Sequence, residues 1–291
     1  MAYFAELSAS GLEPVRFEGS GDLDCLCIAK GGIEGWWSTP AAKVNVTARG
    51  QGDGGHDVSE DDISYASRTV TLHWNANASS RDALLALTDS VRRLVHRQVT
   101  MRVVDGNEDT YCSGGYMVLI QQPDYRSGSI ADSTITIVFE RPERLSSQPQ
   151  KVQIWPQADS GLGGLRYGGK ATGLQYPVQY GVEVSDSRNA CVLHNDGTSR
   201  AYPIFQATGP FPDGVAVAFQ DGSSLSYSQP VGVTPLILDS RSHSATIGGV
   251  DVSRGLIARG FPVIEPGGSL GVTLQSSGSG WVTCVTHDAY M

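Results

Sequence analysis

The stretch that most constrains the fold runs from Ser79 to Gln98. Its leucines and valines recur at the spacing that places them on one face of an amphipathic helix. Ser79, with Asp82 three residues later, suits a capping box at the N-terminal end. Arginines near the C-terminal end complement the helix dipole. The sequence therefore predicts one long helix over residues 79–98.

Strand patterns flank this helix. Arg68–Ala76 alternates between apolar and polar residues, and Val99–Val104 is rich in β-branched side chains. The second stretch breaks at Asp105-Gly106, which favours a hairpin. Lys43–Arg49 also has a strand pattern, and the Gly- and Asp-rich residues 50–64 that follow are typical of an exposed loop. The first half thus combines one helix with many strands.

The second half alternates throughout and shows no helical period beyond Tyr176. Short strands separated by turn signals favour a β-sandwich. Gly248-Gly249 suits the positive φ angles of a two-residue hairpin. We therefore predict a mainly β (β-rich α+β) protein. Its N-terminal domain is β-sandwich-like with one long helix and a β-hairpin, and its C-terminal domain is a β-sandwich.

A chain of 291 residues can hold two domains with separate cores. Around Arg141 the composition shifts to Pro, Ser and Gly with no sustained period, which indicates a junction. We predict domains over residues 1–146 and 177–291, joined by a connector over 147–176 with a short strand at Val152–Trp155. Residues 1–146 should fold alone, because the helix and its flanking strands all lie inside that piece.

The net charge of −9 argues against a protein that coats nucleic acid, because there is no surplus of cations to neutralise phosphates. The N-terminus lacks the basic and apolar regions of a signal peptide, and no apolar run is long enough to span a bilayer. We expect a soluble protein made in a cytoplasm. The five cysteines are odd in number and widely spaced, which favours reduced, buried thiols over a disulfide framework.

No motif supports catalysis or a cofactor. Gly164–Lys170 has the glycine and lysine spacing of a phosphate-binding loop, but it lacks the hydroxyl residue after the lysine and the strand and helix around it. The histidines show no metal-ligand spacing, and the acidic loop 53–62 lacks the ladder of a calcium loop. A hydrolase with a triad assembled from distant residues stays open as a weaker alternative. We predict no catalytic residue, no cofactor and no metal.

Four aromatic residues are candidates for contact with a partner or a glycan. Trp36 and Trp37 are adjacent, and neighbours on a strand point to opposite faces, so one of them is expected to be exposed. Tyr202 and Trp281 are candidates in the second half, where an exposed aromatic ring beside polar groups would suit a sugar.

The order and spacing of several motifs resemble the distal tail (Dit) proteins of siphophages, especially those of phages that infect actinobacteria. The first half carries Gly32–Trp37, Gly52–His56, Arg68–Leu72, the helical segment and Arg141–Leu145 in the family's order. The second half carries His194–Thr198, Ala201–Pro203, Gly209-Pro210, Leu236–Asp239 and Gly248-Gly249, and resembles the family's galectin-like or carbohydrate-module-like sandwich.

The resemblance implies a structural virion protein at the tail tip. In that family the N-terminal domains form a hexameric ring that continues the tail tube, joins the tail-tip hub or baseplate and lets DNA pass. The implied partners are further copies of the chain, the tail tube protein and the hub or tail-associated protein, with the tape measure protein or a receptor-binding protein as further candidates. A lumen crossed by DNA should not be basic, which suits the net charge of −9. The alternative is a carbohydrate-binding protein that recognises a host cell-wall glycan through the C-terminal sandwich.

Overall fold

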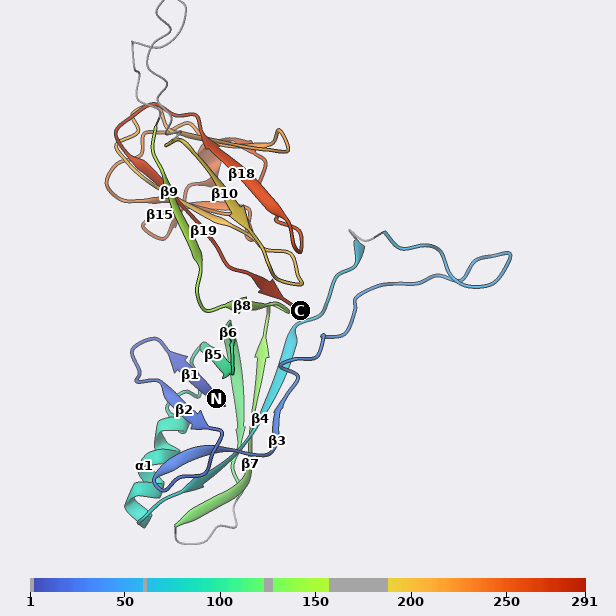
Figure 1. Cartoon of the computed structure of the whole chain (residues 1–291), viewed down its shortest axis with the longest axis vertical. Helices are drawn as coiled ribbons and strands as arrows, with labels where there is room; N and C mark the ends of the chain where they lie inside the picture. Colours follow the sequence, from blue (N-terminus) through green and yellow to red (C-terminus); the bar gives the residue numbers. More distant parts are fainter. Residues whose placement is uncertain (1–2, 60–61, 123–127, 157–187) are drawn as a thin grey trace, which may run out of the picture. The chain divides into compact units, whose positions relative to one another are not determined.

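The structure, a computed structural model, describes residues 3–59, 62–122, 128–156 and 188–291 (Figure 1). The chain divides into two units, Met1–Gln148 with Asp288–Met291, and Pro149–His287. The second unit is therefore inserted between two segments of the first. The predicted connector includes a strand of the second unit, and residues 157–176 and 177–187 lie outside the described residues, as does the Gly164–Lys170 motif.

The first unit contains nine strands and the helix α1 within the described residues. Their bounds are β1 Tyr3–Ala9, β2 Val15–Glu18, β3 Cys25–Glu34, β4 Arg68–Asn77, α1 Arg81–Arg92, β5 Val99–Asp105, β6 Glu108–Ile120, β7 Ser129–Phe139, β8 Arg144–Ser146 and β20 Ala289–Tyr290.

Seven of these strands close a barrel in the order β6-β5-β1-β2-β3-β4-β7, because β6 also pairs with β7. Alternation along β4 points Val70, Leu72 and Trp74 into the barrel, where they are fully buried. The mainly β prediction is confirmed. The strands of this unit close on themselves, however, where the sequence analysis expected a sandwich-like arrangement, and closure leaves neither β6 nor β7 as a free edge.

The C-terminus contributes a strand to the first unit. β8 pairs with β6 through Tyr111 and Leu145, and β20 pairs with β8 through Ala289. The backbone N–H of Ser146 also donates to the carbonyl oxygen of Asp288 at 2.9 Å. A fragment of residues 1–146 contains β8 without the β20 strand that pairs with it.

The helix is shorter than predicted. α1 begins after the N-cap Ser80, whose hydroxyl accepts from the N–H of Ala83 at 3.2 Å, so Ser80 takes the capping role expected of Ser79. Ser79 instead donates through its N–H and hydroxyl to the Asp24 carboxylate. Beyond Arg92 the chain continues in turns bonded from each residue to the third before it, and a positive φ of 66° at His96 ends the helical stretch.

A long arm leaves the barrel between β3 and β4 over residues 38–67 (Figure 1). Lys43 N–H donates to Ser64 at 2.7 Å and Ala66 N–H to Ala41 at 2.8 Å, so its two halves run antiparallel. The strand predicted at Lys43–Arg49 is wrong, because only isolated bridges form there. Strand pairing needs a continuous partner, and the Gly-rich return segment supplies one at single points only.

The second unit is a sandwich of two antiparallel sheets, as predicted. The sheets have the orders β10-β18-β12-β13-β17 and β16-β15-β14-β11-β19-β9. The bounds are β9 Gln150–Ile154, β10 Ala190–His194, β11 Ile204–Thr208, β12 Val215–Phe219, β13 Ser224–Tyr227, β14 Leu236–Asp239, β15 Ser244–Ile247, β16 Val250–Asp251, the 3₁₀ turn η2 Ser253–Gly255, β17 Leu256–Arg259, β18 Ser269–Leu274 and β19 Trp281–Thr286.

The core of the sandwich lies between these sheets. Phe205 of β11 and Phe219 of β12 meet there with ring centroids 5.3 Å apart. The hairpin predicted at Gly248-Gly249 is confirmed: Ile247 pairs with Val250, and the two glycines have φ angles of 57° and 83°.

Candidate interaction surfaces

The base of the arm is fixed by a buried arginine. Arg68 is fully buried, and its Nη1 donates to the carbonyl oxygens of Gly35 at 2.7 Å, Trp36 at 2.8 Å and Ser38 at 2.8 Å. Its Nε donates to Pro142 at 2.6 Å. Burial lowers the pKa of Arg68 from its ordinary value, because it disfavours the charged form. The carbonyl oxygens oppose this effect, because their hydrogen bonds stabilise the guanidinium cation. Arg68 directly follows the arm in sequence and binds the backbone where the arm begins. One guanidinium therefore links the point at which the chain leaves the barrel to the point at which it returns.

Arg68 was not predicted to be a functional residue, although the sequence carries a signal for it. Arg68 is in phase with Val70, Leu72 and Trp74, so alternation assigns it to the barrel interior. A charged residue on a buried face needs several hydrogen-bond partners. Its partners are backbone carbonyls, which no side-chain motif can reveal.

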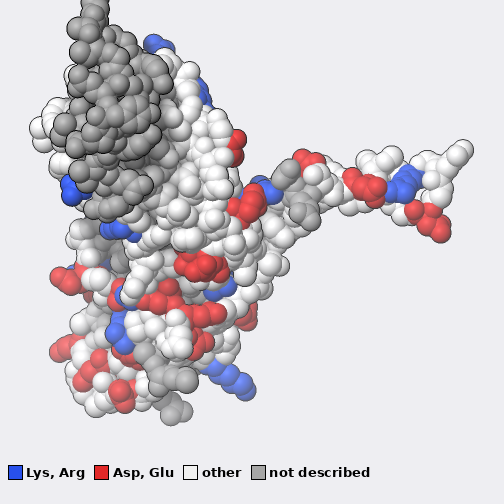
Figure 2. Space-filling model, turned by 45° about the horizontal axis from the view of Figure 1, so that its top comes forward, with Lys and Arg blue, Asp and Glu red and all other residues white. Residues whose placement is uncertain are grey.

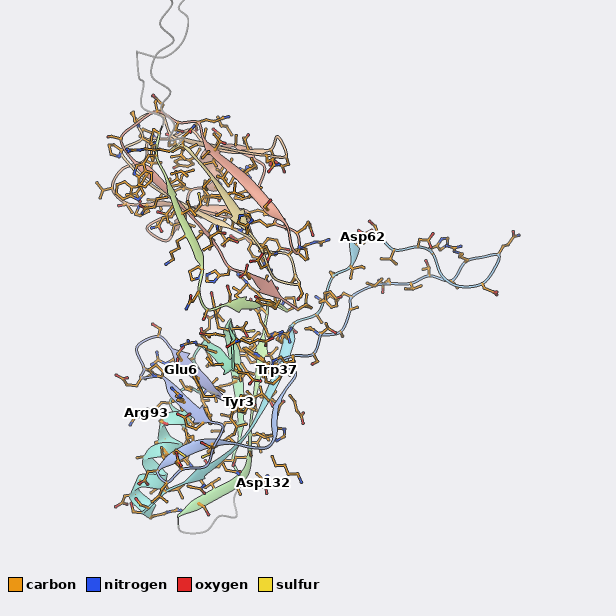
Figure 3. The ribbon with its side chains drawn as sticks, viewed as in Figure 1. Tyr3, Glu6, Trp37, Asp62, Arg93 and Asp132 are labelled. Carbon is orange, nitrogen blue, oxygen red and sulfur yellow. The ribbon has the colours of Figure 1, made fainter. Side chains whose placement is uncertain are left out.

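The adjacent tryptophans Trp36 and Trp37 differ in exposure. Trp36 is fully buried in the barrel core, so the structure does not offer it to a partner. Trp37 is 42% exposed, and its indole Nε1 donates to the Glu108 carboxylate at 3.2 Å. Figure 3 shows Trp37 close to the barrel where the arm begins, and Asp62 on the arm itself. Trp37 is therefore positioned on the surface at the root of the arm.

The arm exposes both backbone and side chains. None of its described residues is buried, and Val46, Val58 and Ile63 are exposed apolar residues. Acidic and basic side chains are interspersed along it (Figure 2). An exposed, extended segment with scattered apolar side chains is suited to contact with another protein surface.

A second surface lies on the outside of the barrel. Tyr116, Val118 and Ile120 of β6 are all more than half exposed, at 59%, 54% and 56%. They pair with Val138, Thr136 and Thr134 of β7, and Thr136 in turn pairs with Thr71 of β4. This group, which we call the β6–β7 face, contains no charged residue: Thr69, Thr71, Tyr116, Val118, Ile120, Thr134, Thr136 and Val138.

The β6–β7 face has a sequence signal of its own. Tyr116-Met-Val-Leu-Ile120 is a continuous apolar run, and Met117 and Leu119 point to the barrel core. A strand that is apolar on both faces is normally covered on both faces. Here the outer face is exposed, so the pattern indicates a cover that the described residues do not provide.

A polar cavity of about 550 Å³ lies within the first unit near β8 and β20. Arg144 lies there, with Nη1 3.8 Å from Glu108 and its guanidinium carbon 6.0 Å from the centre of the Tyr290 ring. Nearby, Arg102 binds Asp109 with two hydrogen bonds of 2.8 and 2.6 Å, which lower the pKa of that carboxyl. The lining residues are Asn107, Glu108, Asp109, Thr110, Arg144, Ser146, Ser147, Gln148, Asp288 and Tyr290.

The aromatic candidates of the second unit are separate from these surfaces in sequence and fold. Tyr202 is half-buried, and the Arg241 guanidinium lies 4.8 Å from its ring centre, so one face of the ring is already covered. Trp281 is 36% exposed on β19. The residues described here contain no group of three or more His, Cys, Asp or Glu side chains placed to hold a metal ion, and no helix among them is long and apolar enough to cross a membrane.

The fold defined by these units is similar to the folds of phage tail proteins of known structure. The structure is similar to the crystal structure of the SPP1 Dit protein, described as a paradigm of the hub adsorption apparatus in phages infecting Gram-positive bacteria. The TM-score is 0.59 at 10% identity, and the similarity covers 99% of both chains.

Two further similar structures are chains of the phage P2 baseplate in its activated conformation. The calcium form gives a TM-score of 0.51 and the strontium form 0.53, each at 13% identity and covering 98% of both chains. No protein-family model matches the sequence, and no curated protein matches it. The predicted fold of a siphophage distal tail protein is therefore confirmed, while the actinobacteriophage type stays a prediction.

Proposed function

We propose that the protein is a non-enzymatic component of a phage virion that forms a ring at the tail tip. The observation that carries this proposal is the similarity to the SPP1 Dit protein over 99% of both chains, which includes both units and not a single common domain. Its work is assembly: the ring, which we propose to be hexameric, joins the tail tube to the tail-tip hub and leaves a passage for DNA.

The two surfaces of the first unit fit this role. A ring is built from heterologous contacts, in which each subunit presents two different and complementary surfaces. We propose that a second copy of the chain covers the β6–β7 face and that the arm contributes to the opposite side of the contact. The face offers apolar and hydroxyl side chains without charge, which an interface can bury at low desolvation cost.

The mass of the purified protein in solution, measured by light scattering with negative-stain images of the same sample, tests the proposal. Rings with a mass six times that of the 30.9 kDa chain are the expected result. Rings of another subunit number would keep the class and correct the symmetry. A chain that stays monomeric alone and in the presence of tail tube and hub proteins would overturn the ring.

Binding of a cell-wall glycan by the second unit is the competing proposal. Its support is limited to the partial exposure of Trp281, because Arg241 already covers one face of Tyr202. A glycan array with the full chain and with a Trp281→Ala variant separates the two functions. Binding that the substitution removes would establish a sugar site beside the structural role.

A further inference from the structure

Four of the five cysteines lie in two thiol pairs. Cys25 and Cys27 alternate with Leu26 on β3, and their Sγ atoms are 2.9 Å apart. In the second unit, Cys191 on β10 and Cys284 on β19 are in phase with the buried Leu193 and Val282, so both thiols face the core, and these two strands are in contact. Cys112 is buried, and its Sγ contacts the carbonyl oxygen of Glu143. Each pair combines one half-buried thiol, Cys25 or Cys191, with one buried thiol.

The backbone around the first pair permits a disulfide. Residues two apart on a strand have Cα atoms about 6.6 Å apart, which lies at the upper end of the range of about 4.4–6.8 Å found in disulfides. Cys25 is the first residue of β3 and follows Asp24, whose φ is 59°. The strand can bend at its first residue more readily than in its middle, so the sulfurs can approach to bonding distance.

The two thiols of this pair differ in access. Cys25 is half-buried, and its Sγ donates to the carbonyl oxygen of Asp22 at 2.9 Å. Cys27 is buried, and burial together with the hydrogen bond to Cys25 raises its pKa to about 12. An oxidant in solution therefore meets Cys25 first, and Cys27 resolves the product.

We propose that Cys25 and Cys27 form an oxidisable dithiol that closes to a disulfide within β3. With oxidised glutathione as the oxidant, the Cys25 thiolate attacks one glutathione sulfur, and the other glutathione leaves as a thiolate. Cys27 then gives its proton to water and attacks Cys25 Sγ, which expels the second glutathione. Two protein thiols become one disulfide, and one glutathione disulfide is reduced to two thiols.

Cys191 and Cys284 carry the same chemistry on an independent observation. Cys191 lies on β10 and Cys284 on β19, which belong to opposite sheets of the sandwich. A bond between them would close a loop from residue 191 to residue 284 and join the two sheets. A long closed loop restricts the unfolded chain far more than the three-residue ring of Cys25 and Cys27. Oxidation at this pair therefore stabilises the second unit.

The redox conditions of the compartment determine whether the cysteine pairs exist as thiols or as disulfides. Thiols persist in a reducing cytoplasm, and disulfides form after exposure to an oxidising exterior. A protein assembled inside a cell and then released would pass from the first state to the second without a change of fold. The chemistry of the pairs does not depend on the tail function proposed above.

Thiol counting on the full-length protein tests both pairs. The reduced, folded protein is incubated with oxidised glutathione, denatured, and labelled with N-ethylmaleimide for intact-mass analysis. Five labels are expected before oxidation and one, on Cys112, after it. The variants Cys25→Ser and Cys191→Ser should each raise the oxidised count from one to two, and Cys112→Ser should lower it to zero.

Peptide mapping identifies the bonds. Three labels with a linked Cys25–Cys27 peptide would support the first pair and overturn the second, and a linked Cys191–Cys284 peptide would do the reverse. Five labels, a persistent glutathione adduct on Cys25, or disulfide-linked dimers would overturn the first pair. Calorimetry adds a readout for the second: oxidation should raise the unfolding temperature of the wild type by several degrees, and this shift should vanish in Cys191→Ser.

Discussion

Arg68 Nη1 lies 2.8 Å from the carbonyl oxygen of Trp36, so a cation inside the barrel holds the backbone from which the arm leaves. The same nitrogen also serves Gly35 and Ser38, one on each side of Trp36. The backbone at the root of the arm is therefore held by a side chain in the core, while the arm itself is exposed.

Replacement of Arg68 by Met should destabilise the first unit by roughly 3 kcal/mol or more, because several carbonyl oxygens lose their donor at once. Lys should give an intermediate loss, since an ammonium cannot reproduce the planar fork of a guanidinium. Urea unfolding checks this, with the exposed Arg97→Met as the control, which should change stability by less than about 0.5 kcal/mol. Equal stability of the two Met variants would contradict the assigned role.

Gly35→Ala should also loosen the root of the arm. Gly35 has a φ of 80°, and an added Cβ would meet the carbonyl oxygen of Thr69 at a clashing 2.2 Å. Gly11→Ala is the matched control, because Gly11 has a φ of 76° with no atom within 4 Å of an added Cβ. Backbone strain alone costs about 1–3 kcal/mol at either site. We expect Gly35→Ala to lose clearly more stability than Gly11→Ala. Similar unfolding midpoints for the two variants would show that the backbone at Thr69 shifts without a free-energy cost.

The double variant Val118→Asp, Ile120→Asp should prevent ring formation and leave a folded monomer. Both side chains are exposed, so the fold tolerates charge there, whereas an uncompensated charge buried in a subunit contact costs about 3–5 kcal/mol. Ile257→Asp is the control, because Ile257 is 74% exposed on the second unit, outside the β6–β7 face. Light scattering distinguishes the outcomes, and intact rings in the double variant would exclude this face from the contact.

The Arg102–Asp109 pair predicts a pH dependence. The hydrogen bonds from Arg102 lower the folded-state pKa of Asp109. The contribution to stability is therefore complete above the unfolded-state pKa of about 3.9 and is lost as pH falls through the lower, folded value. The stability difference between wild type and Asp109→Asn should be constant from about pH 5 to 7 and shrink below about pH 4.

An NMR titration of the Asp109 carboxyl gives an independent check. In an Arg102→Met variant the pKa should move up towards its ordinary value, because the hydrogen bonds from Arg102 that chiefly lower it are gone. A pKa that stays low in this variant would assign the shift to Ser147, which also bonds to Asp109.

The local elements of this protein follow from local sequence. The alternation of Arg68–Ala76, the Asp105-Gly106 turn and the Gly248-Gly249 hairpin are patterns complete within a few residues, and each forms where predicted. The helix was found but predicted too long, mainly because turns replace it after Arg92. At its N-terminal end, Ser79 and Ser80 are equivalent caps in sequence. Only Asp24, more than fifty residues earlier, removes Ser79 from that role by accepting its hydrogen bonds.

Tertiary structure alone decided the rest, because the deciding contacts join residues far apart in the chain. Lys43–Arg49 alternates like a strand but lacks a continuous partner, so alternation did not suffice. Ala289 pairs with Leu145, which returns the C-terminus to the first unit. Cys191 and Cys284 lie on strands of the two opposite sheets, a placement that sequence spacing could not indicate. The periodicity of a strand shows which of its faces is apolar. The strands that pair with it are determined by the closure of the barrel and the packing of the sandwich.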